Sequence, residues 1–477
     1  MVRHYKLTFT AVGPIHIGTG RKLNKLDYFS SKDGIAVLDV PRFLEKLSAA
    51  QVEEYCEFLE TADSSTGLQT LLDSDPAMRK AAEGSVAYRA DAKLTMARRG
   101  TYQYLDVAEC IKGVDGRPYV PGSSVKGMLR TALLTHLIAA DRKTYLGLLD
   151  ESAVKKGDKS ACEKIESRAF EREHPDRDDT SVVNDIMRYI SVSDSEPLKA
   201  SDIVFAKKYD KFCKADDGRH KLNMGKISQD PGYYEGSELN LYREALKPGT
   251  LIVVNVDIDS RVDAYFPGLK LDKEGLSKVL GESFELYSKC FLNQFDTGEG
   301  AGGGKGGSSA AGDGRCQYVT SLGMRCRNEA IGGTCYCRLH KDGGGSGGAG
   351  ASGGAKACTC YLGGGVDFDS KTVINALYAD NIYKRVGLIS ETLYAQFPTK
   401  LDPSLHRELQ RDVLDAGFTP ITMRAQYKSG RVSKGKDDHR HWRDPEFKVS
   451  PHTLKLGKVG AKKYPMGKCT VKIEERQ

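Results

Sequence analysis

The chain has 477 residues with 39% hydrophobic content, which is enough for two or three domains with real cores. Its longest apolar stretches are far too short to cross a bilayer and its first residues lack the layout of a signal peptide, so the sequence predicts a cytoplasmic protein with no membrane partner. The net charge of +7 is modest for this length and does not by itself indicate nucleic-acid binding.

The N-terminal region predicts a strand followed by a glycine-rich loop. Residues 5–12 alternate between polar and apolar side chains, which is typical of a strand, and the loop Gly13–Gly20 follows directly. Residues 35–39 predict a second short strand, and a helix start is expected at Pro41. Residues 51–98 mix charges freely and are expected to be mostly helical or irregular.

The segment YVPGSSVKGMLRTALL, residues 119–134, combines a turn with a helix start. Its Pro-Gly pair ends an extended run. Either Ser123 or Ser124 can then cap a helix over about residues 124–140, because a serine hydroxyl accepts a hydrogen bond from a free backbone N–H. Apolar residues recur on one side of this helix at helical spacing.

Two cations occupy the first turns of the same predicted helix. Lys126 and Arg130 are four residues apart and therefore share a face near the helix N-terminus. Free N–H groups, the positive end of the helix dipole and two cations together favour an anion, most simply a phosphate. The alternative is an ordinary capped helix with a solvated basic face.

Strand and helix patterns return after a highly charged segment, residues 141–181, which is expected to be a surface insertion. The predicted strands are Tyr189–Ser193, Ile203–Lys207, Leu251–Ile258 and Cys469–Ile473, and the predicted helices are Gly275–Leu292 and either 371–378 or 402–415. This order fits an α+β protein with two ferredoxin-like domains. The first would span residues 1–184, and the second would combine 185–297 with 358–477.

A glycine-rich region interrupts the predicted second domain. Residues 298–365 hold 23 of the 51 glycines, and two tracts, 298–314 and 343–357, flank a cysteine-rich core at 315–341. Such tracts cannot bury apolar surface and behave as flexible tethers. We therefore expect an independent small module inserted between them.

The cysteine-rich core predicts a structural zinc site. The four proposed ligands are Cys316, Cys326, Cys337 and His340, with Cys335 competing for the third position. About 25 residues cannot form a hydrophobic core, whereas a tetrahedral Zn²⁺ held by three thiolates and an imidazole could fold them. Disulfides are the alternative and fit poorly with a reducing compartment. Cys358 and Cys360 are either spare ligands or plain thiols.

The C-terminal part adds a second glycine loop and most of the positive charge. Residues 363–372 begin with Gly363, Gly364 and Gly365 and lead into a predicted helix with Lys371 near its N-terminus, so they form either a phosphate cradle or the end of a linker. Residues 421–477 contain 15 Lys+Arg against 6 Asp+Glu, a local excess of +9. A basic region on a nearly balanced body favours a groove for a polyanion.

The chain also resembles a known family. The string at residues 119–134 and the loop Gly13–Gly20 are similar to signature elements of the RAMP proteins of CRISPR effector complexes. Further similar segments lie at Val192–Ser195, Tyr242–Thr250, Ser450–Lys455 and Met466–Gly467. Their order and spacing resemble the fifth-subunit family of the type III-A complex. The Cys/His module is not part of that pattern.

The resemblance implies a fold, a function and partners. It implies two RAMP domains in a non-catalytic subunit that binds the 3′ part of the CRISPR RNA, caps the backbone filament and assists 3′-end maturation. The implied partners are CRISPR RNA and neighbouring backbone subunits, with target RNA and a host 3′-trimming nuclease as further candidates. RNA would be held mainly through its phosphates. The predicted RNA-binding residues are Gly18, Thr19, Gly20, Ser123, Ser124, Lys126, Arg130, Gly363, Gly364, Gly365, Lys371, Lys455, Lys458, Lys462 and Lys463.

Two other function classes stay open. His16 lies where some CRISPR RAMP endonucleases keep a catalytic base, and Asp27 lies roughly where the repeated backbone subunit carries its target-cleaving Asp. Neither has a partner that sequence alone fixes beside it, so a metal-independent endoribonuclease is the weaker hypothesis. A scaffold that recruits a nuclease through the zinc module is the other.

Overall fold

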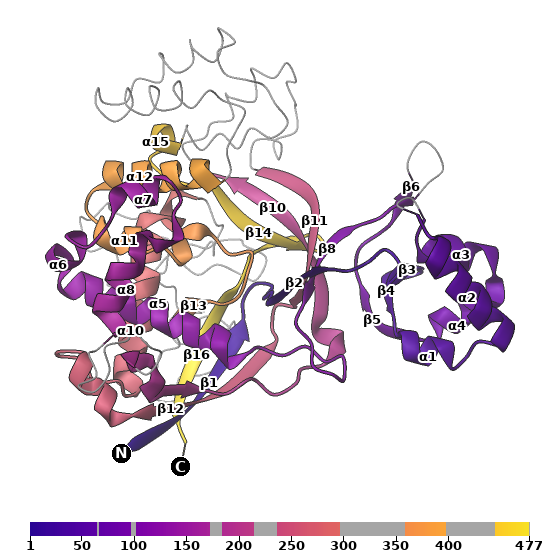
Figure 1. The fold of residues 1–477 in the computed structure, drawn as a ribbon, viewed down its shortest axis with the longest axis horizontal. Helices are drawn as coiled ribbons and strands as arrows, with labels where there is room; N and C mark the ends of the chain where they lie inside the picture. Colours follow the sequence, from indigo (N-terminus) through magenta and orange to yellow (C-terminus); the bar gives the residue numbers. More distant parts are fainter. Residues whose placement is uncertain are drawn as a thin grey trace, which may run out of the picture. The chain divides into compact units, whose positions relative to one another are not determined.

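The computed structural model describes residues 1–63, 66–96, 102–171, 184–213, 236–295, 358–396 and 444–476. All of them belong to one compact unit, built from residues 1–296 and 357–477. The fold is mixed α+β, as predicted (Figure 1). Within the described part of the chain, no helix combines the length and apolar character needed to cross a membrane.

The central sheet has five strands in the order β13-β16-β1-β12-β9. Its strands are β1 (Val2–Ala11), β9 (Ile190–Val192), β12 (Leu251–Asp259), β13 (Cys358–Tyr361) and β16 (Lys468–Glu475). All neighbours are antiparallel, and Leu7 of β1 lies opposite both Val254 and Ile473. With helices α5 (Gly122–Ala140) and α10 (Lys273–Cys290), the sheet follows the β-α-β-β-α-β order of a ferredoxin-like unit, extended by β13.

Both helices pack on one face of this sheet and form the largest core (Figure 1). Alternate residues of β1, such as Leu7 and Phe9, are fully buried there, as the period-2 pattern of a strand requires. From α5, Val125, Leu129 and Leu133 contribute at helical spacing. Each such side chain stabilises the fold by roughly 2 kcal/mol through burial.

A second sheet has six strands in the order β15-β14-β10-β11-β8-β2. Its strands are β2 (Gly18–Lys22), β8 (Asp106–Cys110), β10 (Ile203–Phe212), β11 (Gly236–Leu246), β14 (Thr453–Val459) and β15 (Lys462–Pro465). The β8–β11 pair is parallel and the other pairs are antiparallel. This sheet therefore draws strands from the beginning, middle and end of the chain.

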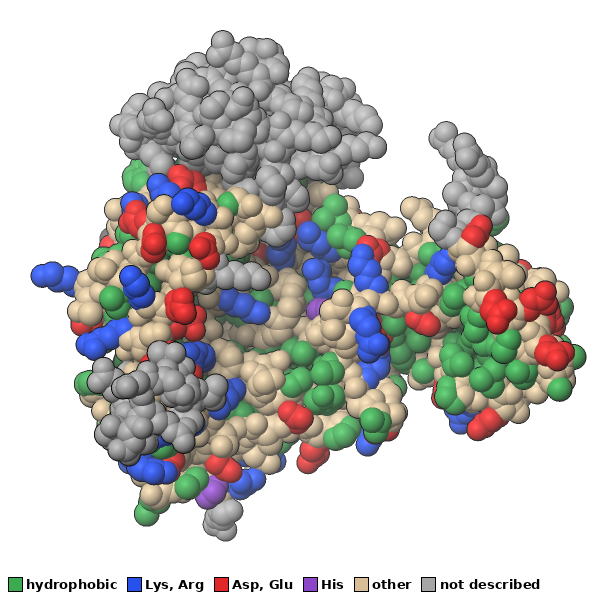
Figure 2. All heavy atoms as spheres, in the orientation of Figure 1, with side chains coloured by type: hydrophobic (Ala, Val, Ile, Leu, Met, Phe, Trp, Pro, Cys, Tyr) green, Lys and Arg blue, Asp and Glu red, His purple; other side chains and the backbone are tan. Residues whose placement is uncertain are grey.

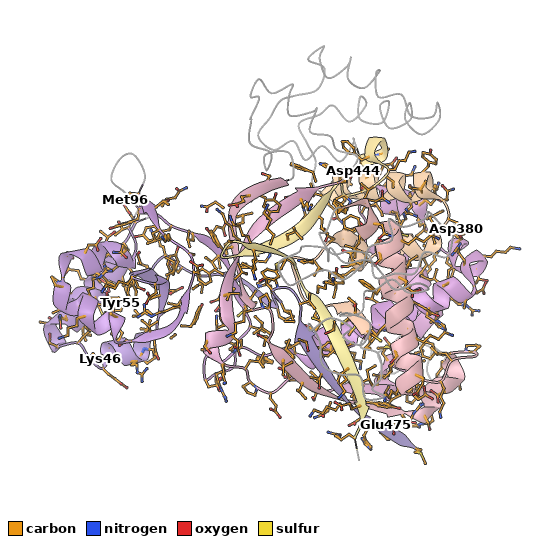
Figure 3. The ribbon with its side chains drawn as sticks, turned by 180° about the vertical axis from the view of Figure 1, so that it is seen from behind. Lys46, Tyr55, Met96, Asp380, Asp444 and Glu475 are labelled. Atoms are coloured by element: carbon orange, nitrogen blue, oxygen red, sulfur yellow. The ribbon has the colours of Figure 1, made fainter. Side chains whose placement is uncertain are left out.

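Residues 28–105 contain a smaller sheet with its own core. Its order is β3-β4-β5, and helices α1 to α4 contribute to the core. The elements are β3 (Tyr28–Ser31), β4 (Gly34–Leu38), β5 (Val86–Ala90), α1 (Val40–Leu44), α2 (Ala49–Thr61), α3 (Leu68–Ser74) and α4 (Pro76–Glu83), with the short pair β6 (Thr95–Met96) and β7 (Tyr102–Gln103) nearby in the chain. Tyr55, labelled in Figure 3, packs edge-to-face on Phe43 with ring centroids 5.4 Å apart.

The remaining described elements are helices, most of them short. They are α6 (Arg142–Leu146), α7 (Glu151–Lys155), η1 (Lys159–Cys162), α8 (Glu163–Phe170), η3 (Ile186–Tyr189), η4 (Ala200–Asp202), η6 (Ser260–Tyr265), η7 (Leu292–Gln294), η8 (Phe368–Ser370), α11 (Ile374–Leu377), α12 (Ile382–Gln396) and α15 (Asp444–Phe447). The prediction of a surface insertion at 141–181 is wrong over its described residues. Tyr145, Ile165 and Phe170 are buried in the main core, and Val154 packs in a cluster with α12. The charged residues that the structure describes within 141–171 are exposed or half-buried.

Other sequence-based boundaries also differ from the structure. The predicted limit at residue 184 does not separate the sheets, because β1 and β16 are neighbours in one sheet and β2 and β14 belong to the other. Within residues 51–98 the helices are confirmed, but β5 was missed. A second ferredoxin-like domain is not confirmed. The predicted helix at 402–415 lies outside the described residues, whereas α11 lies within the predicted 371–378.

Candidate nucleic-acid interface

The two predicted glycine loops meet in space although nearly 350 residues separate them in the chain. The Gly364 N–H donates to the His16 carbonyl at 2.7 Å, and these residues form an isolated antiparallel bridge. Gly363 lies so close that a Cβ built on it would be 2.3 Å from the His16 oxygen, and its φ is +83°. Only glycine fits such a position, because it has no Cβ and tolerates positive φ. The sequence predicted both loops, and the structure joins them.

The start of α5 is capped differently from the prediction. Pro121 is the N-cap, and the Gly122 N–H donates to Asp194 Oδ1 at 2.7 Å. Asp194 thus supplies from another segment the acceptor that Ser123 or Ser124 was expected to supply, so the predicted serine cap is wrong. Both serines lie in the first turn with hydroxyls that make no hydrogen bond among the described residues.

Lys126 and Arg130 share a helix face, but their surroundings differ. Arg130 Nη1 is 2.7 Å from Asp185 Oδ2, and its guanidinium lies 4.0 Å from the centre of the Phe170 ring. Glu166 contacts the same guanidinium at 3.5 Å. This geometry favours a structural role for Arg130. Lys126 is half-buried and has no carboxylate partner in the described part of the chain.

Other positions of α5 line a cavity of about 410 Å³. We call it the α5 cavity, and its wall brings together six of the predicted RNA-binding residues. They are Gly18, Ser123, Ser124, Gly363, Gly364 and Lys371. Helix α10 and strand β13 form the other walls. The two glycine loops and α5 therefore form one site, which none of the three segments shows by itself.

A group of cations lies beside the glycine loops. We call it the basic cluster: Lys208, Arg243 and Lys455, from the adjacent strands β10, β11 and β14. Asp210 lies among them, 3.1 Å from Lys455 and 3.4 Å from Lys208. Burial and the neighbouring Lys455 charge lower the pKa of Lys208, and burial lowers that of Arg243. Three cations around one carboxylate leave a net positive field, which favours a polyanion.

Arg243 connects the basic cluster to the second glycine loop. A Cβ on Gly365 would be 2.9 Å from Arg243 Nε, so the loop backbone packs directly against the guanidinium. In the described part of the chain this guanidinium has no ion-pair partner. Lys371 is held at the same loop, because its Nζ donates to the Gly363 carbonyl at 2.8 Å. Burial lowers the pKa of Lys371 although its side chain reaches solvent.

The structure thus adds Lys208 and Arg243 to the candidate residues. The sequence placed Arg243 in a segment similar to the family, but it gave no sign of which sheet face the side chain occupies. Lys208 is not among the predicted residues, because the predicted strand ends at Lys207, whereas β10 continues to Phe212. Figure 2 shows Lys and Arg side chains gathered across the middle of one face, over the strands of the second sheet.

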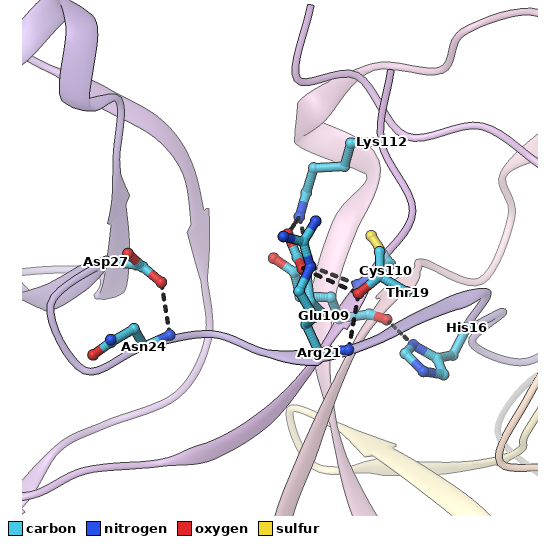
Figure 4. Close-up of polar contacts among 9 residues, drawn as sticks. His16, Thr19, Arg21, Asn24, Asp27, Glu109, Cys110 and Lys112 are labelled. Carbon is cyan, nitrogen blue, oxygen red and sulfur yellow. Dashed lines mark hydrogen bonds and ion pairs between the residues drawn. The ribbon is translucent and has the colours of Figure 1, made fainter. Parts of the chain in front are cut away.

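The first glycine loop is supported by a polar network (Figure 4). His16 is 6% exposed and its Nδ1 donates to the Glu244 carbonyl at 2.7 Å. The Glu244 carboxylate accepts from the Cys110 N–H at 2.8 Å and pairs with Lys112 at 2.6 Å. Burial lowers the pKa of His16 and raises that of Glu244 to about 7. These contacts give His16 a structural role in joining the loop to β11.

Several of the other predicted residues already have partners within the protein. The Thr19 hydroxyl donates to Glu109 at 3.1 Å, and Asp27 accepts from the Asn24 N–H at 2.6 Å in a turn before β3 (Figure 4). Gly20 lies between them in the chain with open space around it. In the β14–β15 hairpin, Lys458 pairs with Glu238, Lys463 lies 3.9 Å from the centre of the Tyr209 ring, and Lys462 is exposed. The cysteine-rich core with Cys316, Cys326, Cys337 and His340 lies outside the described residues.

A buried carboxyl, Asp367, connects the second glycine loop to the basic cluster. Its Oδ1 accepts from the Lys455 N–H at 2.9 Å, and its Oδ2 accepts from the Tyr287 hydroxyl at 3.2 Å. Burial raises the pKa of Asp367 to about 7, while the Lys455 charge lowers it and the Asp210 charge raises it. The folded protein therefore keeps a proton that an unfolded chain releases near pH 4.

We expect Asp367→Asn to remove part of the pH dependence of stability. A carboxyl whose pKa is raised on folding contributes stability below its unfolded pKa, and this contribution is lost as pH rises from about 4 to about 7, by up to ~1.4 kcal/mol per pH unit. The amide keeps an oxygen for the Lys455 N–H. Guanidinium unfolding gives the free energy of unfolding of the variant and of the wild type at each pH. The variant's value minus the wild-type value should be larger at pH 7.5 than at pH 5. The exposed Asp33→Asn is the control; an equal difference at both pH values would contradict the prediction.

A model of the RAMP superfamily matches residues 8–317, about two thirds of the chain. The chain belongs to the RAMP superfamily. Curated relatives of the chain include the CRISPR system Cms protein Csm5 of Mycobacterium tuberculosis (strain CDC 1551 / Oshkosh), 26% identical over 273 residues that cover 54% of this chain and 67% of the relative. The Csm5 protein of Streptococcus thermophilus is 22% identical over 297 residues, covering 61% and 73%.

Solved structures of similar chains are more distant. A chain of the cryo-EM structure of the Csm-crRNA-target RNA ternary complex in a type III-A CRISPR-Cas system has a TM-score of 0.49 and 16% identity, covering 99% of this chain and 100% of that chain. The crystal structure of T. onnurineus Csm5 has a TM-score of 0.39 and 19% identity, covering 59% and 80%. Membership in the RAMP superfamily rests on the sequence match.

Proposed function

We propose that this RAMP protein is a subunit of a type III-A CRISPR effector complex that binds the 3′ part of the CRISPR RNA. The observation that most directly supports this proposal is the geometry of the site. Two glycine loops from distant parts of the chain meet beside the first turn of α5 and a basic cluster from three adjacent strands. The curated relatives named Csm5 support the choice of complex.

The proposed chemistry is recognition of the RNA backbone. Glycine loops let phosphates approach backbone N–H groups closely, and Arg243, Lys208 and Lys371 supply positive charge beside them. Such contacts position a strand without reading its sequence. This suits a guide RNA, whose variable part must be held whatever its bases are.

In the proposed role the protein caps the backbone filament and assists maturation of the RNA 3′ end without cutting RNA. Neighbouring backbone subunits are the direct protein partners, and target RNA and a trimming nuclease are further proposed partners. No contact of His16 or Asp27 favours a nuclease, because both side chains are held by structural hydrogen bonds.

Co-purification followed by RNA sequencing tests the proposal. A tagged chain, expressed in cells with a type III-A locus, should recover CRISPR RNA together with the other complex subunits. A matched strain lacking the CRISPR array is the control for nonspecific RNA. Recovery of unrelated RNA only, or of no RNA, would contradict the proposed function. Incubation of the purified protein with precursor RNA in chelator should leave that RNA uncut.

We also propose that Zn²⁺ folds the inserted module through Cys316, Cys326, Cys337 and His340, with Cys335 as the competing third ligand. The proposal rests on the ligand types and their spacing in the sequence. Metal analysis of the same purified sample should find about one zinc per chain, as one tetrahedral site requires. A chain purified without any zinc would contradict it.

A further inference from the structure

We infer that the α5 cavity receives one nucleotide of the bound RNA, with its base turned out of the strand. This inference rests on the proposed function, because it assumes that RNA lies along the glycine loops. It goes beyond that function by assigning a pocket to a single nucleotide and an aromatic wall to its base.

Small residues create the cavity on α5. The positions that face it are Ser123, Ser124, Gly127, Met128, Thr131 and Ala132, which recur at helical spacing. Lys126 and Arg130 are not among the residues that line it. A Cβ on Gly127 would meet no atom within 4 Å. The helix thus leaves open a volume of about 410 Å³, within the range of ligand pockets.

The wall opposite α5 is aromatic. Phe284 of α10 and Tyr361 of β13 stack with ring centroids 6.4 Å apart and planes 22° apart, and both line the cavity. Tyr287 packs edge-on against Tyr361 at 5.1 Å and fixes its ring. A nucleobase fits such a wall, because every base has a flat π-face that stacks on aromatic side chains.

Other residues of the lining carry polar groups that suit the sugar and the phosphate of a nucleotide. The hydroxyls of Ser123, Ser124, Ser283 and Thr359 make no hydrogen bond among the described residues. Lys371 Nζ, held by the Gly363 carbonyl, supplies a cation at the glycine loop. Gly18, Gly363 and Gly364 belong both to the loops and to the cavity wall, so a strand on the loops lies next to the cavity.

The chain offers a variant that fills the cavity without removing a contact. Gly127→Leu places a side chain into the open space, and leucine is a better helix former than glycine. Gly281→Leu on α10 is the matched control, because a Cβ there also meets nothing within 4 Å and Gly281 does not line the cavity. Both variants replace a helical glycine by leucine, so they differ in whether the new side chain lies at the cavity.

The test is a double-mutant cycle with RNA. A set of otherwise identical single-stranded RNAs, each lacking the base at one position, is titrated against the full-length protein. We expect wild type and Gly281→Leu to lose roughly tenfold in affinity at one abasic position, the value of one base–aromatic stack. Gly127→Leu should lose about the same for intact RNA and nothing further at that position.

The outcomes separate the two proposals. Wild-type protein that binds none of the RNAs would overturn both the proposed function and the nucleotide pocket. RNA binding that is equal for wild type and Gly127→Leu, or that shows no position-specific abasic loss, would overturn the pocket alone. If Gly127→Leu does not fold, Phe284→Leu replaces it, because removal of the half-buried aromatic wall should cancel the same abasic loss.

Discussion

Replacing Arg243 and Lys371 together by Gln is expected to weaken binding of single-stranded RNA roughly tenfold at physiological salt. Both cations lie at the second glycine loop, and neither has a carboxylate partner in the described part of the chain. Each phosphate contact releases bound counterions, so losing two should lower the slope of log affinity against log salt by about 1.4. Fluorescence anisotropy at several salt concentrations measures both quantities.

The control for this change is Lys32→Gln with Lys80→Gln. Lys32 is exposed in the turn between β3 and β4 and Lys80 is exposed on α4, and their replacement alters the net charge by the same amount. The control should change affinity by less than about twofold, because exposed charges beyond a Debye length are screened. An unchanged salt slope in the Arg243 and Lys371 variant would mean that these groups do not contact phosphates.

Replacing Gly363 by Ala is expected to lower the free energy of unfolding by about 3 kcal/mol or more. Positive φ alone costs an L-residue roughly 1–2 kcal/mol. The added Cβ would also lie 2.3 Å from the His16 carbonyl oxygen, and backbone on both sides leaves little room for adjustment. The hydrogen bond from Gly364 to that carbonyl, which joins the two loops, would then be strained or lost. Guanidinium unfolding measures the change.

Gly20→Ala separates the two causes. Gly20 has nearly the same φ, +84°, but no atom within 4 Å of a built Cβ. This variant should lose only the cost of the backbone conformation, so the difference between the variants reports the contact with His16. Equal destabilisation would contradict a close approach of the loops.

Gly363→Ala should also weaken RNA binding. Lys126→Ala, by contrast, should leave the free energy of unfolding unchanged within about 0.5 kcal/mol.

Strand and helix identities could be predicted where the pattern is local. The alternation in β1 and the apolar spacing of α5 and α10 appear directly in the sequence, because each side chain's face follows from the geometry of its own element. The prediction of a surface insertion at 141–181 is wrong because it also rests on a local pattern, the high content of charged residues. Its polar residues are many, but Tyr145, Ile165 and Phe170 are buried in the main core.

The segments of the candidate site could be predicted separately, but their arrangement in space could not. The loops at Gly18 and Gly363 and the serines of α5 were identified one by one, and the structure places them around one cavity. Lys126 and Arg130, the two cations predicted on this helix, do not line the cavity, and Arg130 is held by Asp185. Sequence spacing shows that two residues share a face, but it does not show what that face contacts.

The sequence by itself determined the α+β class, the family and the existence of two glycine loops, since these depend on residue types and short spacings. Only the tertiary structure decided that the loops touch at His16 and Gly364, and that Lys208, Arg243 and Lys455 converge beside them. The physical reason is strand order. Pairing β1 with β16 and β10 with β14 brings the two ends of the chain together, and no local pattern encodes which strands become neighbours.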